Sequence, residues 1–539
     1  MHRVAVLLLC LVGAVIGEGE KGIPYVTPSE GRVWPKPQME VTEQTYLIVR
    51  PATFKFRIVG KTCDLLEKAL SRYMDIMFSA RTKSPAAGYS KTKMFRGYLD
   101  TVDVHLMAEC EKQPYLHMDE HYQIKVDSPD RPLEGSIIAA SVWGAFRGLE
   151  SFSHLLVADG GSYRVNSTQI MDHPRFPHRG LMIDSSRHFL PLSSIKQTLD
   201  LMSMDKFNVL HWHIVDSQSF PYQSDVYPDL SGLGSWTSRH IYTSEDVATV
   251  VSYALERGIR VMPEFDTPGH TDSWGPGQPG LLTECYKHGK PDGTYGPVDP
   301  SNEDNYDFLK KLFTEVTQRF PDHYLHLGGD EVSFRCWRSN PELSEFMQHL
   351  NITGDYAALE QYYITKLLEL VGDLPTKNGY LVWQEVFDNG VELANDTVVH
   401  IWKDGGDMDR VNQELADVTA SGFQTLLSSC WYLNVISYGV DWHKYYSCDP
   451  QGFNGTDAQK ALIVGGEACM WGEYVDRTNL ISRTWPRASV VAEKLWSAAD
   501  ATTNPDEATP RLEEHRCRLL GRGYGVEPFG PSYCDADIV

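Results

Sequence analysis

Two adjacent carboxylates, Asp330 and Glu331, are the residues of this sequence best suited to acid–base chemistry. They follow the apolar segment 324–327 and a pair of glycines, so the pattern predicts a short buried strand that ends in glycines and then in charge. An ionised carboxylate beside so apolar a segment is costly unless it is paired or used. The alternative without chemistry is a polar strand-to-loop junction with a helix cap.

The elements that must position these carboxylates recur along the second part of the chain. Apolar segments of strand length lie at 180–184, 208–215, 259–265, 324–327, 380–383, 398–402, 423–427 and 462–466. Helical patterns separate them, for example at 194–204, 244–257, 306–319 and 357–371. Strands alternating with helices eight times over predict a (β/α)8 barrel. A doubly wound open sheet is the rival, but no GxGxxG motif follows the first strand.

A (β/α)8 barrel gathers its active site at the carboxyl ends of its strands. Aromatic walls with a few polar groups suit a sugar, whose C–H faces stack while its hydroxyls need donors and acceptors. Besides Asp330 and Glu331, the predicted strand ends carry Asp184, Arg187, His188, His211, Trp212, His213, Asp216, Glu264, Asp266, His270, Trp383, Glu385, Trp402, Asp404, Trp431, Tyr432, Asn434, Glu467, Trp471 and Glu473.

Two chemistries compete for these residues. His211, His213, Asp216 and His270 could hold a divalent metal, although the tryptophans have no role in that interpretation. The two histidines of the HxH pair also share one face of a strand, and that face could simply point into the barrel. The other chemistry is glycoside hydrolysis with Glu331 as general acid, and we favour it. It requires neither a metal nor a cofactor.

The adjacency of the two carboxylates raises a geometric objection to an ordinary two-carboxylate glycosidase. Neighbouring residues of a strand point to opposite sides, so Asp330 and Glu331 cannot simply flank one bond as acid and nucleophile. Some glycosidases instead use the substrate's own 2-acetamido group as nucleophile. One carboxylate then orients that group while its neighbour handles the proton, so the adjacency predicts an N-acetylhexosamine substrate.

The first part of the chain predicts two further segments. Residues 1–17 have a basic start, an apolar run and small residues before a cleavage point, which is typical of a secretory signal peptide. Residues 18–172 alternate β-rich runs (46–49, 54–58, 102–106) with helical ones (63–79, 141–152), which predicts a small α+β domain. We expect the barrel to occupy 173–539. No later stretch has the length and apolar character of a transmembrane segment.

Composition narrows the class of partner and the compartment. The formal net charge of −23 argues against nucleic acid and anionic membranes as partners. Sequons at Asn166, Asn351, Asn395 and Asn454 fit glycosylation in the secretory pathway. With Cys10 in the signal peptide, nine cysteines remain, none in a CxxC pair, so four disulfides and one free thiol are expected. Joining neighbours gives Cys63–Cys110, Cys285–Cys336, Cys430–Cys448 and Cys517–Cys534, with Cys469 left over, although sequence alone does not establish this connectivity.

Several segments together resemble the animal lysosomal β-N-acetylhexosaminidases of glycoside hydrolase family 20. The resemblance runs from Trp34-Pro35 almost to the end of the chain and is carried by 180–191 (GLMIDSSRHFLP), 211–216 with Phe220-Pro221, 264–270, 326–332 and 466–475 (GEACMWGEYV). It implies a (β/α)8 barrel and a retaining exo-enzyme that removes terminal N-acetylglucosamine or N-acetylgalactosamine. It also implies a lysosomal address, with secretion as the alternative, and a homo- or heterodimer.

The resemblance assigns roles to individual residues. Glu331 matches the general acid/base, Asp330 the carboxylate that holds the acetamido nitrogen, and Tyr432 the tyrosine that hydrogen-bonds the acetamido oxygen. His270, with Asp266 beside it, matches a supporting group near the acid. The aromatic walls of the acetamido pocket correspond to Trp383, Trp402 and Trp471, and the residues that grip the ring hydroxyls to Arg187, Asp216 and Glu473. Since a free glutamic acid titrates near pH 4.3, we expect an acidic optimum.

The chain departs from the family pattern in three places. The animal subunit types carry Asn-Arg or Asp-Leu beside the pocket tyrosine, whereas this chain carries Asn434-Val435, which follows the α type at the first position only. Neutral substrates should therefore be preferred and 6-sulfated ones accepted weakly. The loop 287–293 resembles the one that contacts a ganglioside-activator protein, but its residues differ. The pair Cys430 and Cys448 is an addition to the family's usual three disulfides.

A different class of function is a carbohydrate-binding lectin that has lost catalysis. Such proteins usually lack the Asp-Glu pair, and here Asp330 and Glu331 are both present.

Overall fold

The computed structural model describes residues 26–78, 92–534 and 537. The predicted signal peptide at 1–17 lies outside these residues. Among the residues described, no helix combines the length and the apolar character that crossing a bilayer requires.

The first part of the described chain is a mixed eight-stranded sheet with two helices on it. The strand order is β2-β4-β6-β5-β8-β1-β3, with β7 paired to β8. The two helices, α1 (Asp64–Phe78) and α2 (Val142–His154), pack on each other and bury residues at helical spacing. Each strand and helix predicted for this region is found, although the strand predicted at 46–49 is only the end of β1, and β3, β5, β6, β7 and β8 were not predicted. The strands are β1 (Met39–Val49), β2 (Lys55–Gly60), β3 (Phe95–Tyr98), β4 (Thr101–Leu106), β5 (Tyr122–Ser128), β6 (Arg131–Ala139), β7 (Val157–Asp159) and β8 (Ser162–Asp172).

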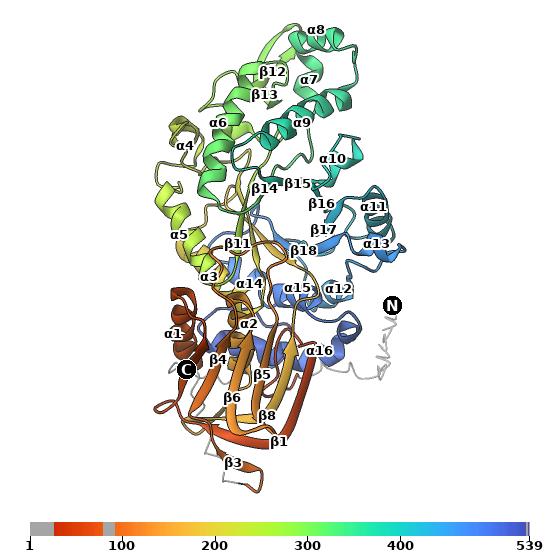
Figure 1. Ribbon diagram of the computed structural model, residues 1–539. Helices are drawn as coiled ribbons and strands as arrows, with labels where there is room; N and C mark the ends of the chain where they lie inside the picture. The colour runs from red at the N-terminus through yellow and green to blue at the C-terminus, as the bar shows by residue number, and fades with distance from the viewer. Residues whose placement is uncertain (1–25, 79–91, 535–536, 538–539) are drawn as a thin grey trace, which may run out of the picture.

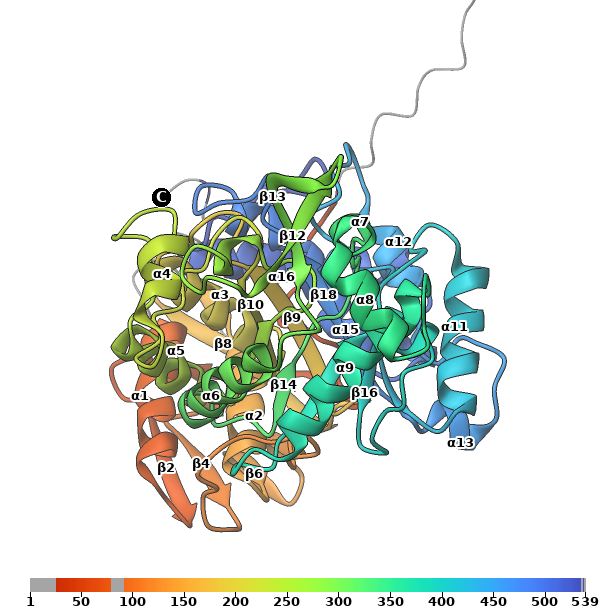
Figure 2. The same cartoon turned by 90° about the horizontal axis from the view of Figure 1, so that it is seen from above.

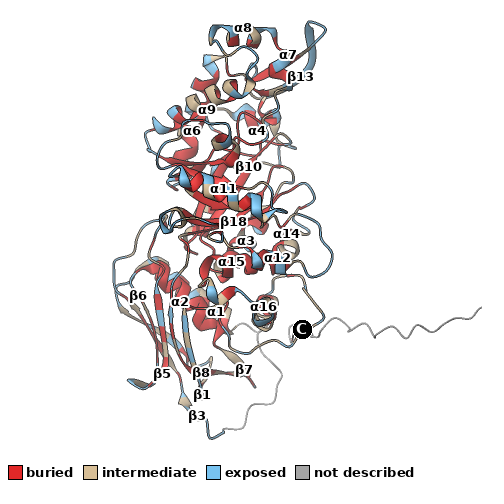
Figure 3. Cartoon of the chain, turned by 90° about the vertical axis from the view of Figure 1, so that its right-hand side faces the viewer, coloured by how far each residue is buried: buried red, intermediate tan, exposed pale blue. Residues whose placement is uncertain are grey.

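The second part is a closed barrel of eight parallel strands in the order β10-β11-β14-β15-β16-β17-β18-β9, as predicted. Its strands are buried along their whole length (Figure 3). Strands covered on both faces read as continuous apolar runs, which is why the sequence pattern located all eight. They are β9 (His178–Asp184), β10 (Val209–Val215), β11 (Arg260–Phe265), β14 (Tyr324–His326), β15 (Gly379–Trp383), β16 (Val398–Ile401), β17 (Gln424–Leu427) and β18 (Ile463–Met470).

Helices surround the barrel, and one hairpin is inserted between β11 and β14. That hairpin, β12 (Leu282–Lys287) and β13 (Lys290–Val298), lies beside the short helix α7 at the end of the molecule far from the first sheet (Figures 1 and 2). The loop predicted at 287–293 is the exposed tip of this hairpin and the start of β13. The helices are α3 (Leu192–Met204), α4 (Pro228–Gly234), α5 (Ser244–Leu255), α6 (Glu303–Arg319), α7 (Arg335–Ser339), α8 (Pro341–His349), α9 (Tyr356–Gly372), α10 (Gln384–Asp388), α11 (Met408–Ala420), α12 (Trp442–Ser447), α13 (Asp457–Lys460), α14 (Leu480–Thr484), α15 (Arg487–Trp496) and α16 (Pro505–Gly521).

Buried ion pairs join the first sheet to the barrel, with α2 and α16 between them (Figure 1). Glu120, just before β5, accepts hydrogen bonds from Arg147 on α2 at 2.9 Å and from Arg179 on β9 at 2.6 Å. Lys206, after α3, lies 3.2 Å from Asp172 at the end of β8. Removing one partner of such a pair would leave an uncompensated buried charge, so these contacts fix how the two parts sit together.

Side chains fill the barrel in layers, because every second residue of a strand points inward. The lowest layer is apolar and includes Val209, Met262 and Val398. Two residues further along those strands the inward positions hold His211, Glu264 and His400, so an apolar layer is followed by a charged one.

The eight cysteines are joined as Cys63–Cys110, Cys285–Cys336, Cys430–Cys448 and Cys517–Cys534, the pairs obtained by joining neighbours. Cys469 is a buried free thiol on β18. The Cys285–Cys336 bond ties β12 to α7, and Cys430–Cys448 encloses the loop that carries Tyr432.

Candidate active site

The two adjacent carboxylates lie outside the strand that precedes them. Strand β14 ends at His326, and the backbone then turns through Gly328, Gly329 and Glu331 with φ values of 69°, 96° and 51°. The alternation that sent Asp330 and Glu331 to opposite sides therefore does not apply, and that prediction is wrong. One carboxylate oxygen of each lies near Nε2 of His270, at 3.6 Å for Asp330 and 3.7 Å for Glu331. Both carboxylates thus face the same imidazole.

The glycines before this pair are required by close approach as well as by conformation. A Cβ on Gly328 would lie 1.8 Å from Oδ1 of Asp266, and one on Gly329 would lie 2.5 Å from the side chain of Val386. The backbone N–H of Gly329 donates to Asp266 at 2.9 Å. The glycines thus let the turn lie directly against β11.

The two carboxylates differ in exposure, which suits different roles. The side chain of Glu331 is 60% exposed and that of Asp330 only 9%. Within the described part of the chain, Oδ1 of Asp330 is buried and accepts no hydrogen bond from an N–H or hydroxyl group. A buried acceptor of this kind calls for a donor from a ligand. Burial, and then the neighbouring Asp330 carboxyl group, to which Asp266 is hydrogen-bonded, raise the pKa of Asp266 well above its usual range, so Asp266 is neutral.

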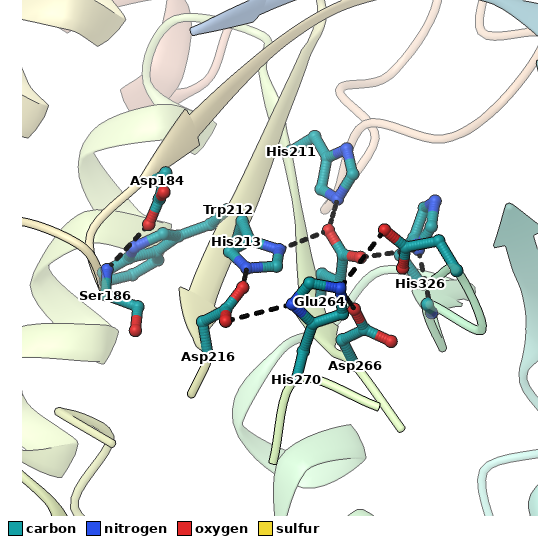
Figure 4. Close-up of polar contacts among 12 residues, drawn as sticks. Asp184, Ser186, His211, Trp212, His213, Asp216, Glu264, Asp266, His270 and His326 are labelled. Carbon is teal, nitrogen blue, oxygen red and sulfur yellow. Dashed lines mark hydrogen bonds and ion pairs between the residues drawn. The ribbon is translucent and has the colours of Figure 1, made fainter. Parts of the chain in front are cut away.

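Residues at the carboxyl ends of four strands form a charged group beside the acid. Arg187 lies 3.0 Å from Asp184 and 2.8 Å from Asp216. Asp216 also lies 3.1 Å from Nδ1 of His270 (Figure 4). Glu473 is exposed on the loop after β18, and its charge contributes to the raised pKa of Arg187, for which burial is the opposing cause. This group supplies charged donors and acceptors of the kind that bind sugar hydroxyls.

An aromatic cluster adjoins the charged layer of the barrel, with Trp383 stacked on His400 at a centroid distance of 4.3 Å. Trp383 and Trp471 are buried in it with Met182 and Cys469, and Trp402 and Tyr432 pack against them. Their rings meet pairwise at centroid distances of 6.4 Å for Trp383–Trp402, 6.0 Å for Trp402–Tyr432 and 6.4 Å for Tyr432–Trp471. The indole N–H of Trp402 donates to Glu385 at 2.9 Å. Four aromatic side chains from four strand ends therefore form one cluster, whereas Trp212 and Trp431, which the sequence placed at the same strand ends, pack in the main core.

The histidines considered as metal ligands are directed at carboxylates. His211 Nε2 and His213 Nδ1 both lie within 2.8 Å of the same oxygen of Glu264, and His213 Nε2 lies 2.7 Å from Asp216 (Figure 4). The HxH pair does point into the barrel, as the alternative interpretation held. In the described residues His211 instead lies close to His326 and His400, and each of these has a hydrogen-bond partner.

This network sets the protonation of its members. Burial alone would lower the pKa values of His211, His213 and His270, but adjacent carboxylates raise them to about 9, about 10 and about 9. Burial also opposes ionisation of Glu264 and Glu467, yet the surrounding histidines hold their pKa values well below 4.5. The interior of the barrel therefore contains the charged histidines His211 and His213 beside carboxylates, whereas burial lowers the pKa values of His178, His326 and His400.

We expect thermal stability to be greatest at mildly acidic pH. The raised histidine pKa values contribute stability that is complete below the ordinary value of 6.5 and is lost as pH rises through about 9 to about 10. The lowered glutamate pKa values contribute stability that is present above 4.5 and is lost in stronger acid. Melting temperature measured across pH should therefore be highest between about pH 4.5 and pH 6.5, where both contributions are present. A maximum above pH 8 would contradict this expectation.

A groove opens from the acid toward the inserted hairpin. It has a volume of about 290 Å³ and is lined by Glu331 and His270 at one end and by Tyr295, Arg335 and Cys336 at the other. The side chain of Tyr295 is 51% exposed there. The groove gives solvent and ligands access to the exposed Glu331 carboxylate.

Asn434 is less closely joined to the site than the other predicted residues. It is half-buried, its backbone oxygen accepts a hydrogen bond from Arg483 at 3.0 Å, and its side-chain oxygen has no partner among the described residues. Val435 beside it is exposed.

Sequence reasoning gave no role to Glu264, Glu467 or Asp184, which hold the network together. A signal was present, because each is a charged residue inside an apolar strand, and such a residue is rarely left unpaired. Their partners come from other strands, so only the folded chain identifies them.

Comparison with known proteins agrees with this geometry. Residues 176–499 match the family model described as glycosyl hydrolase family 20, catalytic domain, and residues 33–155 match a model described as beta-acetyl hexosaminidase like. The chain is 48% identical over 511 residues to the beta-hexosaminidase subunit beta of Felis catus, covering 93% of this chain and 94% of that one. It is 47% identical over 513 residues to the subunit alpha of Rattus norvegicus, covering 94% and 95%.

Solved structures support the same assignment. A chitobiase from Flavobacterium johnsoniae superimposes with a TM-score of 0.78 at 31% identity, covering 91% of this chain and 73% of that one. A beta-hexosaminidase from Streptomyces plicatus, at 23% identity and a TM-score of 0.71 over 94% of this chain and 99% of that one, shares the fold. From its sequence matches and its barrel, the chain belongs to glycosyl hydrolase family 20.

Proposed function

We propose that the chain is a retaining exo-β-N-acetylhexosaminidase that removes terminal, non-reducing N-acetylglucosamine or N-acetylgalactosamine from glycoconjugates. The observation that carries the proposal is the buried, unpartnered Oδ1 of Asp330 beside the exposed Glu331. A 2-acetamido group offers that oxygen an N–H and also brings a carbonyl oxygen that can attack the anomeric carbon, whereas the 2-hydroxyl of a neutral hexose offers a donor but no such nucleophile. No metal or cofactor takes part.

In the proposed reaction the substrate supplies the nucleophile. Glu331 donates its proton to the glycosidic oxygen while the acetamido oxygen attacks the anomeric carbon from the opposite face. Asp330 accepts the acetamido N–H and stabilises the positive oxazolinium-type intermediate. Water, deprotonated by Glu331, then opens the intermediate with net retention of configuration. Tyr432 would donate to the acetamido oxygen, and His270, charged between Asp216 and the two carboxylates, would hold them in place.

Two groups of residues would recognise the terminal sugar. The wall of Trp383, Trp402 and Trp471 would enclose the acetamido methyl group, and Arg187, Asp216 and Glu473 would bind the ring hydroxyls. The groove that begins at Glu331 would hold the leaving group, since it is open while the aromatic cluster is buried. An open groove on one side of the acid and a buried wall on the other suit removal of a single terminal residue.

The direct test is hydrolysis of an aryl N-acetyl-β-glucosaminide and of the galactosamine analogue across pH. We expect turnover with retention, an acidic optimum, and no measurable turnover of the aryl β-glucoside that lacks the acetamido group. Equal turnover of the glucoside, or a profile that peaks at or above pH 7.5, would refute the proposal as stated.

Substrates with a negative 6-substituent should be accepted weakly. Asn434 does not repel such a group, but the neighbouring Val435 gives it no positive charge. We expect kcat/KM to be higher on the plain aryl N-acetylglucosaminide than on its 6-sulfate. Val435→Arg should raise the value on the sulfate by up to about fivefold, the effect of one exposed ion pair, and leave the neutral substrate unchanged. A preference of the unaltered enzyme for the sulfate would contradict this assignment.

A dimer is proposed on the basis of an exposed apolar surface beside the pocket loop. Val435, Ile436, Tyr438 and Tyr474 are 51%, 71%, 106% and 77% exposed, and large apolar side chains exposed near one another are typical of a protein interface. Arg483, from the segment after Tyr474, donates to the backbone of Asn434 and so holds the two loops together. Sedimentation of the purified protein as a monomer at micromolar concentration would exclude a stable homodimer.

A ganglioside-activator protein is a candidate partner for the 287–293 hairpin tip, and a pull-down with that tip replaced would test this partnership.

We propose a secretory-pathway protein with a lysosomal destination, or secretion as the alternative. The sequons at Asn351, Asn395 and Asn454 are exposed and Asn166 is half-buried in β8, so the first three are the more accessible to glycosylation. Removal of N-linked glycans from the protein expressed in animal cells, followed by mass measurement, would count the occupied sites.

A further inference from the structure

A single buried carboxylate, Glu264 on β11, contacts the aromatic wall of the site directly and the ring-hydroxyl group (Arg187, Asp216 and Glu473) through His213. One of its oxygens accepts a hydrogen bond from the indole N–H of Trp383 at 2.8 Å. The other lies 2.8 Å from His211 Nε2 and 2.7 Å from His213 Nδ1. Its first oxygen also faces His326 at 3.4 Å. Glu264 has no exposed surface, and Figure 4 shows the histidines converging on it.

His213 carries this contact onward to the ring-hydroxyl group. Its second nitrogen lies 2.7 Å from Oδ2 of Asp216, and that same oxygen lies 2.8 Å from Arg187. The other oxygen of Asp216 lies 3.1 Å from His270. The charged and titratable side chains that contact Asp216 in the described structure are therefore Arg187 from the end of β9, His213 from β10 and His270 from the loop after β11.

We infer that Glu264 is a positioning residue that couples the acetamido wall to the ring-hydroxyl group, by fixing the Trp383 indole and by keeping His213 protonated against Asp216. This inference rests on the proposed function and extends it. Without the negative charge of Glu264, burial would lower the pKa of His213 with only Asp216 to oppose it, so the histidinium partner of Asp216 would lose its proton at lower pH. Burial opposes the ionisation of Asp216, while hydrogen bonds from His213 and His270 lower its pKa. Loss of the His213 charge would therefore raise that pKa and bring protonation of Asp216 into the acidic working range.

The chain offers a matched control in Glu467 on β18. It is equally buried, and it too accepts from two histidines, at 2.8 Å from His211 Nδ1 and 2.6 Å from His178 Nε2. Neither of these histidines contacts Asp216 in the described hydrogen bonds. A purely structural role for the buried network predicts the same consequences for both glutamates.

The experiment compares Glu264→Gln and Glu467→Gln with the unaltered enzyme. For each we would measure melting temperature, kcat and KM on the aryl N-acetylglucosaminide, the pH dependence of kcat/KM, and calorimetric binding of N-acetylglucosamine. Both variants should melt at lower temperature. Only Glu264→Gln should lower kcat/KM, by about ten- to a hundredfold for one lost charge-assisted contact, and move the acidic limb of the profile to higher pH. It should also weaken binding of N-acetylglucosamine.

Two further variants separate the contact of Glu264 with Trp383 from its contact with His213, and they remain informative if Glu264→Gln does not fold. Trp383→Phe removes the indole N–H and should weaken binding without moving the acidic limb, whereas His213→Gln should move the limb. A Glu264→Gln enzyme with an unchanged acidic limb, or Glu264→Gln and Glu467→Gln variants that are kinetically alike, would overturn the inference. Absence of turnover by the unaltered enzyme would refute the proposed function instead, and calorimetric binding would still test the coupling.

Discussion

Replacing Glu331 with glutamine is expected to lower kcat on an aryl N-acetylglucosaminide with a poor leaving group by about 10²- to 10⁴-fold, the usual contribution of a general acid. Glutamine keeps the size of the side chain but cannot donate the proton that the leaving oxygen needs. KM should change little, because an exposed carboxylate at the mouth of a groove contributes little to ground-state binding. The measurement is steady-state kinetics on substrates that differ only in leaving-group acidity.

The dependence on the leaving group makes this prediction specific to the acid role. A strongly acidic phenol needs little protonation to depart, so the deficit of Glu331→Gln should shrink as leaving-group acidity rises. Water would still need a base in the second step, and an added nucleophile such as azide, which needs none, should restore turnover and give the β-glycosyl azide. Glu342→Gln, at an exposed carboxylate on α8, is the matched control and should behave as the unaltered enzyme. A deficit independent of the leaving group would contradict the assignment of Glu331.

Replacing Asp330 with asparagine is expected to lower kcat by about 10²- to 10³-fold, the usual cost of losing one preorganised electrostatic contact. Asparagine can still accept the acetamido N–H, but it has no negative charge to stabilise the oxazolinium-type intermediate. Its amide N–H2 would also face the protonated His270 at the position of an oxygen now 3.6 Å away. The loss should therefore fall on kcat more than on KM.

Substitution of the acetamido group itself tests what Asp330 acts upon. In the unaltered enzyme, successive fluorination of the acetyl methyl should slow turnover steeply, because it weakens the attacking oxygen. In Asp330→Asn the same series should start from a lower rate and remain equally dependent on that oxygen. Detection of a covalent glycosyl ester on Asp330 by mass spectrometry would refute substrate assistance and make Asp330 the nucleophile.

The sequence by itself determined the barrel and most of the residues at its mouth. All eight strands were located, because a strand buried on both faces is apolar at most of its positions, and a run of this kind is visible without knowledge of its neighbours. The carboxyl ends of those strands meet at one end of any such barrel, so Arg187, Asp216, Trp383 and Trp471 could be assigned to one site. The four disulfides of the structure are also the pairs obtained by joining neighbouring cysteines, a connectivity that the sequence alone did not establish.

Only the tertiary structure decided how those residues act on one another. The alternation rule placed Asp330 and Glu331 on opposite sides, but two glycines with positive φ end the strand early and bring both carboxylates to one imidazole. In the sequence, Glu264 is one polar residue among several. Its partners lie on β10, β14 and β15, which are distant in the chain. The pattern of apolar residues in a segment indicates which of its side chains are buried. Which buried charges form pairs depends on which segments lie side by side in the fold. The contacts of Asp330 and Glu331 with His270, and those of Glu264 with its histidines, therefore become visible only in the folded chain.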